Sequence, residues 1–355
     1  MTYLNHCRSG NKIRRFSTML YSMFCLVAAT LLMQPWQCSV AADKPTDTTP
    51  RLALLVPVHP KDYSLIFNDM KDRKTEKFGP FSYETGTIYG VPVVVNVAPM
   101  DGTLMRSLAA QDMVYRYNIR AFLYPGTSGA HLGPDEMRAG DVVLGADNVD
   151  FNNYFYSKSG DVVAHEFSHE ENGEFRYDRL YLDPQLLAKL ACSANRVASQ
   201  TNLPQWLNPK YKRVHPDVFY YGIQGTTTVW LANIELMDKL HAAFGEMDED
   251  GDWYSMLVAT MHGIPFIEVS TITDSIKEFP ETERGIPPKP DDAPIKANQV
   301  GQNVSNKIIL DLIAHEGGSI LAGNFKTPTT NPYEMHLFKT PKQPASLLQQ
   351  GGCEK

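Results

Sequence analysis

The chain has 355 residues, of which 43% are hydrophobic and 21% are charged, and its formal net charge is -7. This composition excludes a disordered chain, which has too few apolar residues to build a core, and a basic nucleic-acid-binding protein. We therefore expect a globular protein without a nucleic-acid partner, long enough for one large α/β domain or two small ones.

The N-terminus has the features of a signal peptide. Basic residues at 8–15 precede an apolar run at 19–33, and small residues at 39–42 resemble a cleavage site. The run is short for a membrane span, so an uncleaved anchor is the alternative. We predict a signal peptide over 1–42, a linker outside the fold over 43–50, and an exported protein, periplasmic or secreted, with no membrane contact beyond the export signal.

Only two cysteines, Cys192 and Cys353, follow the predicted signal peptide. Two cysteines make no disulfide framework. A single bridge that pins the C-terminal tail is the alternative in an oxidising compartment, but Cys353 lies in a Gly-rich end. We therefore expect residues 326–355 to be a disordered tail that this bridge does not pin.

Strands and helices are predicted to alternate along the chain. A short apolar run at 52–58 lacks polar alternation, which is typical of a strand buried on both faces. Residues 88–97 and 121–124 predict two more strands, and a helix is predicted between them over 103–118. The second of these strands leads into a glycine turn at 125–129.

The second half of the chain continues this alternation. Its predicted elements are a strand at 142–144, a helix at 183–197 with Asp183 as N-cap, a strand at 218–223, a helix at 254–262, a strand at 266–270 and a helix from about residue 298. Within the last helix an apolar stripe at 300, 304, 308 and 312 should pack on the sheet. Residues 280–294 predict a Pro-rich loop of the kind that forms a lid or a subunit contact. The pattern predicts a layered α/β domain over 51–325.

The glycine turn is the first place where chemistry is expected. Gly126, Thr127, Ser128 and Gly129 follow a buried strand, at the end where open α/β sheets bind ligands. Backbone N–H groups and two hydroxyls there are suited to cradle a phosphate or the oxygens of a sugar. A turn that binds no ligand is the alternative.

Acidic residues near the next strand are the second place. Asp274 lies where a buried strand ends, and partial burial would raise the pKa of its carboxyl toward neutrality, as a general acid needs. An N-cap is the alternative role. Upstream, the cluster at 248–252 opens a helix, where acidic charge is favourable in any case. A calcium loop is a weak interpretation because Trp253 and Ala259 stand where glycine and glutamate would be required.

The third place is the sequence His165-Glu166-x-x-His169, which has the form of a zinc-protease motif. On a helix the two imidazoles would share one face, and Glu166 would be available as a base. A solvated loop or short helix that happens to fit this pattern is the alternative.

Three of these stretches, at 126–130, 138–143 and 263–275, together resemble the phosphorylase superfamily of purine nucleoside phosphorylases, uridine phosphorylases and methylthioadenosine/S-adenosylhomocysteine nucleosidases. The resemblance lies in order and spacing and covers residues 51 to about 322. It implies a three-layer αβα fold around a mixed, largely parallel sheet. It also implies a nucleoside as the small-molecule substrate and a homo-oligomer, without a cofactor or metal, although inorganic phosphate is a possible co-substrate.

The resemblance also implies roles for individual residues. Residues 126–129 would contact the ribose or phosphate, Asp250 and Asp252 would hold the ribose hydroxyls with Glu249 as a rival, and Asp274 would protonate the leaving base. Water or phosphate would then trap the oxocarbenium-like sugar. A pocket for the base is expected to use aromatic residues, and those considered are Phe151, Tyr154 and Phe155, for which a place in the core is the alternative.

One departure from the family pattern bears on the reaction. The first predicted strand runs into residues 56–60, which contain no glycine and leave no backbone nest for phosphate. The sequence therefore favours hydrolysis, or binding without turnover, over phosphorolysis. Nucleosidases of the family have a water-activating glutamate in the loop after this strand, and the nearest candidates here are His59 and Asp62, both displaced from that position. We predict cleavage of a nucleoside N-glycosidic bond. The alternatives are a nucleoside-binding relative with reduced catalysis and a zinc metallopeptidase, an interpretation that rests only on the five residues of the motif.

Overall fold

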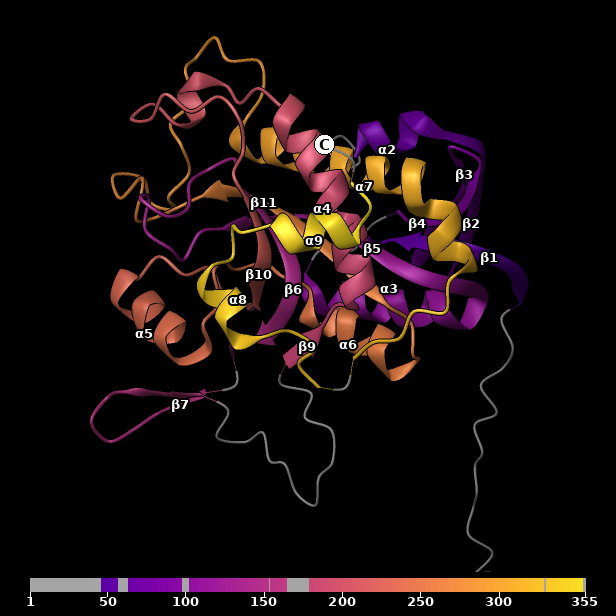
Figure 1. Cartoon of the computed structure of the whole chain (residues 1–355), viewed down its shortest axis with the longest axis horizontal. Helices are drawn as coiled ribbons and strands as arrows, with labels where there is room; N and C mark the ends of the chain where they lie inside the picture. Colours follow the sequence, from indigo (N-terminus) through magenta and orange to yellow (C-terminus); the bar gives the residue numbers. More distant parts are fainter. Residues whose placement is uncertain are drawn as a thin grey trace, which may run out of the picture. The chain divides into compact units, whose positions relative to one another are not determined.

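A nine-stranded mixed sheet organises the chain in the computed structural model, which describes residues 46–56, 63–97, 102–152, 154–164, 179–328 and 330–353 (Figure 1). The strands are β1 (Asp47–Leu54), β2 (Met70–Phe78), β3 (Phe81–Ile88), β4 (Val91–Asn96), β5 (Tyr117–Gly129), β6 (Val142–Asp150), β7 (Tyr154–Tyr156), β8 (Val162–Ala164), β9 (Arg179–Tyr181), β10 (Val218–Thr226) and β11 (Phe266–Asp274). The helices are α2 (Ser64–Asp69), α3 (Thr103–Arg116), α4 (Pro184–Gln200), α5 (Ile234–Phe244), α6 (Trp253–Met261), α7 (Ala297–Ala322), α8 (Met335–Lys339) and α9 (Ala345–Gln350), with a short 3-10 turn, η1 (Gln205–Leu207).

The strand order is β10-β6-β11-β5-β1-β4-β3-β2, and β9 pairs with β6 outside this path. The four central strands β11, β5, β1 and β4 are parallel, whereas β6 is antiparallel to β11 and parallel to β10. At the other edge β2, β3 and β4 form an antiparallel meander. The small hairpin of β7 and β8 forms a separate sheet. The sheet is therefore mixed, as predicted.

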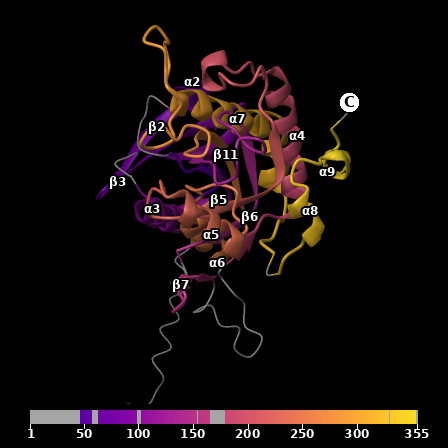
Figure 2. The same ribbon diagram turned by 90° about the vertical axis from the view of Figure 1, so that its left-hand side faces the viewer.

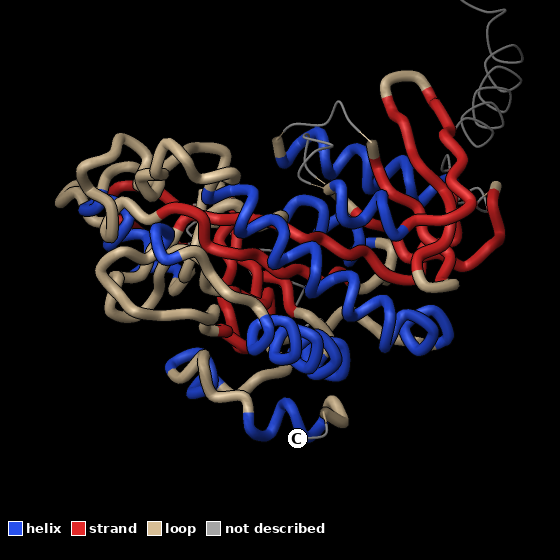
Figure 3. Tube along the Cα trace, turned by 90° about the horizontal axis from the view of Figure 1, so that it is seen from above, coloured by secondary structure: helices blue, strands red, loops and turns tan. Residues whose placement is uncertain are grey.

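Helices cover both faces of the sheet (Figures 2 and 3). Alternate residues at the end of β1 enter different cores. Leu52 and Leu54 pack in the core that includes α4 and α7, while Ala53, and Leu55 just after the strand, pack in the core that includes α3 and α6. A central strand covered in this way has no solvated face, which is why its sequence lacks polar alternation. The three-layer αβα arrangement is confirmed.

The predicted helices are confirmed, with ends within a few residues. Asp183 caps α4 as predicted, because its carboxylate accepts hydrogen bonds from the N–H groups of Gln185 and Leu186. The predicted apolar stripe of α7 is buried. The strand predicted at 88–97 is instead two strands, since Tyr89 and Gly90 have positive φ and turn the chain between β3 and β4. The charged strand β2 has no apolar pattern to predict it.

Two predicted boundaries are wrong. Strand β1 begins at Asp47, so residues 47–50 belong to the sheet and not to a linker; Asp47 pairs with Tyr117 of β5 and its carboxylate contacts Arg51 at 2.8 Å. The C-terminal residues also belong to the folded unit that extends from Pro45. They form α8 and α9, and α9 lies against α4.

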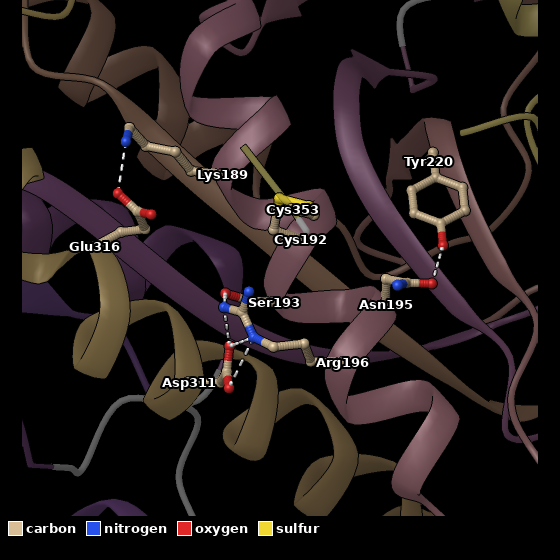
Figure 4. Close-up of a disulfide and its surroundings, with 9 residues drawn as sticks. All are labelled: Lys189, Cys192, Ser193, Asn195, Arg196, Tyr220, Asp311, Glu316 and Cys353. Atoms are coloured by element: carbon tan, nitrogen blue, oxygen red, sulfur yellow. Dashed lines mark hydrogen bonds and ion pairs between the residues drawn. A yellow bond between two sulfur atoms is a disulfide. The ribbon is translucent and has the colours of Figure 1, made fainter. Parts of the chain in front are cut away.

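The expectation that Cys353 stays unpaired is also wrong. Cys192 and Cys353 form a disulfide with their Cα atoms 5.6 Å apart (Figure 4). Burial of Leu347 docks α9, and Gly351 then approaches α4 so closely that a methyl group there would lie 2.5 Å from the sulfur of Cys192. This packing, which local sequence does not reveal, brings the last residues to α4.

No helix within the described residues is long and apolar enough to cross a membrane. The apolar run at 19–33, and with it the predicted signal peptide, lies outside the described residues.

Candidate active site

A short segment at 246–251 is inserted between the ends of two strands. The N–H group of Glu249 donates to the carbonyl of Gly129 at the end of β5 (3.0 Å), and the N–H group of Met247 donates to Ile223 of β10 (2.8 Å). The carbonyl of Asp248 accepts from Gly225 of β10 at 3.1 Å. Hydrogen bonds on both sides hold this segment like a strand, which places its acidic side chains at the carboxyl ends of β5 and β10.

Strands β5 and β11 bring Asp274 to the same place. They pair in parallel as far as Gly129 and Asp274, which are register partners. The N–H group of Ala130 then donates to the carbonyl of Asp274 at 2.9 Å. The regions around Gly126 and Asp274, which lie almost 150 positions apart in the sequence, therefore converge.

Gly129 is the point around which two carboxyl groups meet. A methyl group at this position would lie 2.7 Å from Oδ2 of Asp274 and 3.0 Å from Oε1 of Glu249. Glycine is thus required by close approach, because any side chain would displace one carboxyl group or the other. Both carboxyl groups lie beside the bare α-carbon.

Asp274 has an environment that favours its protonated form. Asp274 is only 5% exposed, and burial raises the pKa of its carboxyl to about 7. The charges of Glu249 and Asp250 act in the same direction. A hydrogen bond from the hydroxyl of Thr273 to Oδ1, 3.0 Å long, opposes this shift. At neutral pH a large fraction of Asp274 therefore carries a proton that it can donate.

A cavity of about 500 Å³ lies beside Glu249, one of the two carboxyl groups that meet at Gly129. Its lining residues come from the start of α3, the loop after β10 and the inserted segment: Gly102, Thr103, Leu104, Arg106, Thr227, Thr228, Val229, Trp230, Glu249 and Asp250. Its volume is within the range of small-molecule sites. Glu249 belongs both to the cavity wall and to the pair around Gly129, so it links the cavity to Asp274.

A family model described as the phosphorylase superfamily matches residues 52–314, which is well over half of the chain and includes β5, the inserted segment and β11. The chain belongs to the phosphorylase superfamily. A search of curated protein sequences finds no match.

Solved structures of nucleosidases and of a hydrolase share this fold. The 5′-methylthioadenosine/S-adenosylhomocysteine nucleosidase of Neisseria meningitidis, in complex with methylthio-immucillin-A, is 15% identical with a TM-score of 0.52, covering 74% of this chain and 99% of the nucleosidase. The corresponding nucleosidase of Colwellia psychrerythraea, in complex with adenine, is 14% identical with a TM-score of 0.53, covering 75% and 96%. Futalosine hydrolase of Helicobacter pylori is 14% identical with a TM-score of 0.53, covering 76% and 97%. At these identities the likeness establishes the fold.

In this superfamily member the predicted glycine turn is part of a strand. Pairing with β11 continues β5 through Gly129, and this long-range pairing overrides the local turn signal. Gly126 is buried, and its carbonyl accepts a hydrogen bond from Ser305 of α7 (2.7 Å). The methyl group of Thr127 faces α7, and the hydroxyl of buried Ser128 donates to Asp248 at 2.8 Å. Of the four predicted residues, only Gly129 adjoins the carboxyl pair.

The three acidic residues predicted for the sugar separate into two groups. Glu249 and Asp250 line the cavity, and Asp250 has a positive φ of 77°. Asp252 is fully buried instead; it caps α6 and pairs with Arg106 at 3.0 Å. Its charge is thus neutralised inside the protein, and only the other two face the space where a ligand would bind.

The predicted aromatic residues do not line the cavity. Phe151 is buried against His131 and Phe244, and Tyr154 lies on β7, where its ring contacts Tyr156. The aromatic residue of the cavity wall is Trp230, whose ring faces the guanidinium of Arg284. Sequence reasoning missed it, because a tryptophan in a loop carries no periodic signal.

His131 was also missed. It lies two residues after the predicted turn and is fully buried. Its ring lies between Glu246 and Glu249, with Nδ1 3.0 Å and Nε2 3.5 Å from the respective carboxylates. Burial lowers the pKa of the imidazole, but the hydrogen bonds and charges of the two glutamates outweigh burial and raise it to about 9. His131 is therefore an imidazolium at neutral pH.

The zinc-protease motif at His165, Glu166 and His169 lies outside the described residues, as do His59 and Asp62. In the part of the chain that is described, no three His, Cys, Asp or Glu side chains cluster so as to hold a metal ion.

Proposed function

We propose that this protein cleaves the N-glycosidic bond of a nucleoside, with Asp274 as the general acid. The observation that carries the proposal is the buried carboxyl of Asp274, which has a pKa of about 7 and lies beside Gly129 with Glu249, a residue that lines a cavity of nucleoside size. A general acid works best when its pKa lies near the operating pH. Membership of the phosphorylase superfamily adds support.

In the proposed reaction Asp274 donates its proton to a ring nitrogen of the base. The bond between the base and C1′ of the sugar breaks, and its electron pair leaves with the neutralised base. Glu249 and Asp250 accept hydrogen bonds from sugar hydroxyls, and their negative charge stabilises the oxocarbenium-like sugar. Trp230 offers an aromatic face for the base.

Water or phosphate then attacks C1′. We favour hydrolysis, because the chain has no glycine at 56–60, after its first strand, where a backbone nest would bind phosphate. Phosphorolysis differs in one measurable respect, since it requires inorganic phosphate and yields a sugar phosphate.

The experiment measures release of free base from adenosine, inosine and methylthioadenosine, with and without phosphate. Wild type should release base from at least one of them, and Asp274→Asn should not. Asp183→Asn is the matched control, because asparagine caps α4 as well as aspartate does and lies far from the cavity residues in sequence. Nucleoside binding without base release in wild type would contradict catalysis and favour the binding protein.

We also propose that the protein is exported and forms homo-oligomers. A disulfide between Cys192 and Cys353 suits an oxidising compartment, and the sequence at 1–42 has signal-peptide features. Leu104, Leu108 and Tyr115 are exposed on α3 beside the cavity, an apolar face of the kind that subunits bury. Cell fractionation with N-terminal sequencing tests export, and light scattering tests assembly; a cytoplasmic full-length chain or a monomer would contradict them.

A further inference from the structure

The surroundings of His131 suggest a role for it in the candidate site. Its imidazole contacts two carboxylates from the inserted segment, Glu246 through Nδ1 and Glu249 through Nε2. Both glutamates are almost fully buried, so solvent screens these contacts very little. The N–H group of Leu231 also donates to Oε2 of Glu249, at 3.3 Å. Oε2 therefore has two donors, and Oε1 is the oxygen that lies beside Gly129.

Both the backbone and the ring of His131 are held in place. The backbone N–H group of His131 donates to the carbonyl of Met247 (2.9 Å), and Nζ of Lys277 donates to the backbone carbonyl of His131 (2.6 Å). The ring of Phe151 packs edge-on against it, with the centroids 5.5 Å apart. On the far side, the carbonyl of Glu246 accepts a hydrogen bond from His241. An imidazole with so little freedom imposes its orientation on the carboxylates that it contacts.

We propose that His131 is a positioning residue of the proposed sugar site, which bridges Glu246 and Glu249 and thereby fixes Oε1 of Glu249 as the acceptor for a sugar hydroxyl. This inference rests on the proposed function, since it assigns a purpose to the orientation of Glu249.

Glu249 and His131 act on Asp274 in opposite directions. The imidazole contacts Glu249 but not Asp274. The charge on Glu249 raises the pKa of Asp274, whereas the charge of His131 lowers it. The role that we propose for His131 is therefore to orient Glu249, and not to supply the proton of Asp274.

The kinetic test compares ribonucleosides with their deoxy analogues. In His131→Asn the amide keeps a donor near Glu246 but has no group at the position of Nε2. We expect kcat/KM to fall about 10- to 100-fold for adenosine or inosine, mostly through KM, and to fall much less for the 2′- and 3′-deoxy analogues. His131→Gln, whose amide reaches the Nε2 position, should restore part of the ribose preference.

Two controls separate positioning from a general effect on the fold. His315→Asn removes an exposed imidazole that also lies beside a carboxylate, that of Asp311, and should change neither parameter. Thermal unfolding of each variant reports whether it folds. Equal losses for ribonucleosides and deoxynucleosides in both folded His131 variants would overturn the positioning role.

A spectroscopic test does not depend on turnover. In protein labelled with ¹⁵N-histidine, the His131 ring signals, identified by their absence in His131→Gln, should be those of an imidazolium at pH 7. Glu249→Gln should shift the Nε2 signal more than the Nδ1 signal. A neutral imidazole at pH 7 would overturn the bridge even in an active enzyme. If wild type releases no base while the imidazolium signals respond as expected, the proposed function fails and the bridge stands.

Discussion

Two groups of buried carboxyl side chains lie close together and have opposite environments. Glu249 and Asp274 meet beside Gly129 at the cavity, and the charge of one raises the pKa of the other. Asp252 and Glu268 lie with Arg106, which is buried, donates to Asp252 at 3.0 Å and faces the ring of Tyr124. The N–H group of Asp252 donates to Glu268 at 3.0 Å. Only three positions separate Glu249 from Asp252.

The difference between these groups lies in what neutralises them. Arg106 pairs with Asp252, so the second group is a structural ion pair under the start of α6. Burial, together with the charges of Asp252 and Asp248, raises the pKa of Glu268 well above its ordinary value. Among the described residues no arginine pairs with Asp274, and burial raises the pKa of its carboxyl to about 7. Aspartate thus forms a structural ion pair in one place and is the proposed proton donor in the other.

The largest expected effect comes from Asp274→Asn, which tests the pair of carboxyl groups beside Gly129. Removal of a general acid should lower kcat by about 100- to 10,000-fold, because asparagine cannot donate a carboxyl proton to the base. Steady-state kinetics measures this change. The free energy of unfolding should hardly change, and a variant with near-normal kcat would assign the acid role elsewhere.

Arg106→Leu tests the second group. It should lower the free energy of unfolding by about 3–5 kcal/mol, because Asp252 would be left buried without its partner. Denaturant unfolding measures the loss. The double variant Arg106→Leu/Asp252→Asn should recover much of it, since asparagine is neutral and still caps α6. No recovery would mean that Arg106 stabilises the fold by some contact other than this pair.

Replacing both Cys192 and Cys353 with serine should destabilise the fold without changing either group of buried carboxyl side chains. The bond joins residues 161 positions apart, and its removal should lower the free energy of unfolding by about 2–4 kcal/mol. Base release per folded molecule should not change. Lower activity in the folded double variant would show that the C-terminal helices influence the cavity.

The pH profile of wild type gives the smallest effect. The carboxyl of Asp274 has a raised pKa and must be protonated to act, so activity is retained below the pKa and lost above it. We expect kcat/KM to fall about fivefold between pH 7 and pH 8, and to approach a tenfold fall for each further pH unit. Initial rates in overlapping buffers measure the profile. A profile flat from pH 6 to pH 9 would contradict an essential acid with this pKa.

The sequence by itself determined the layered α/β class, because runs of apolar residues and helical spacing report which surfaces are buried. It also determined α3, α4, α6 and α7 and the position of Asp274 where a strand ends. These features depend on residues that are neighbours in the chain, and local physical chemistry is sufficient to predict them.

The tertiary structure alone decided which of these residues meet. Pairing of β5 with β11 turned a predicted glycine turn into strand, and insertion of the 246–251 segment brought Glu249 to the cavity while Asp252 faced Arg106. The docking of α9 joined Cys353 to Cys192. Each outcome depends on contacts between distant segments. Asp252 meets Arg106 in the interior whereas Glu249 lines the cavity, and no local pattern records which surroundings each carboxylate will have.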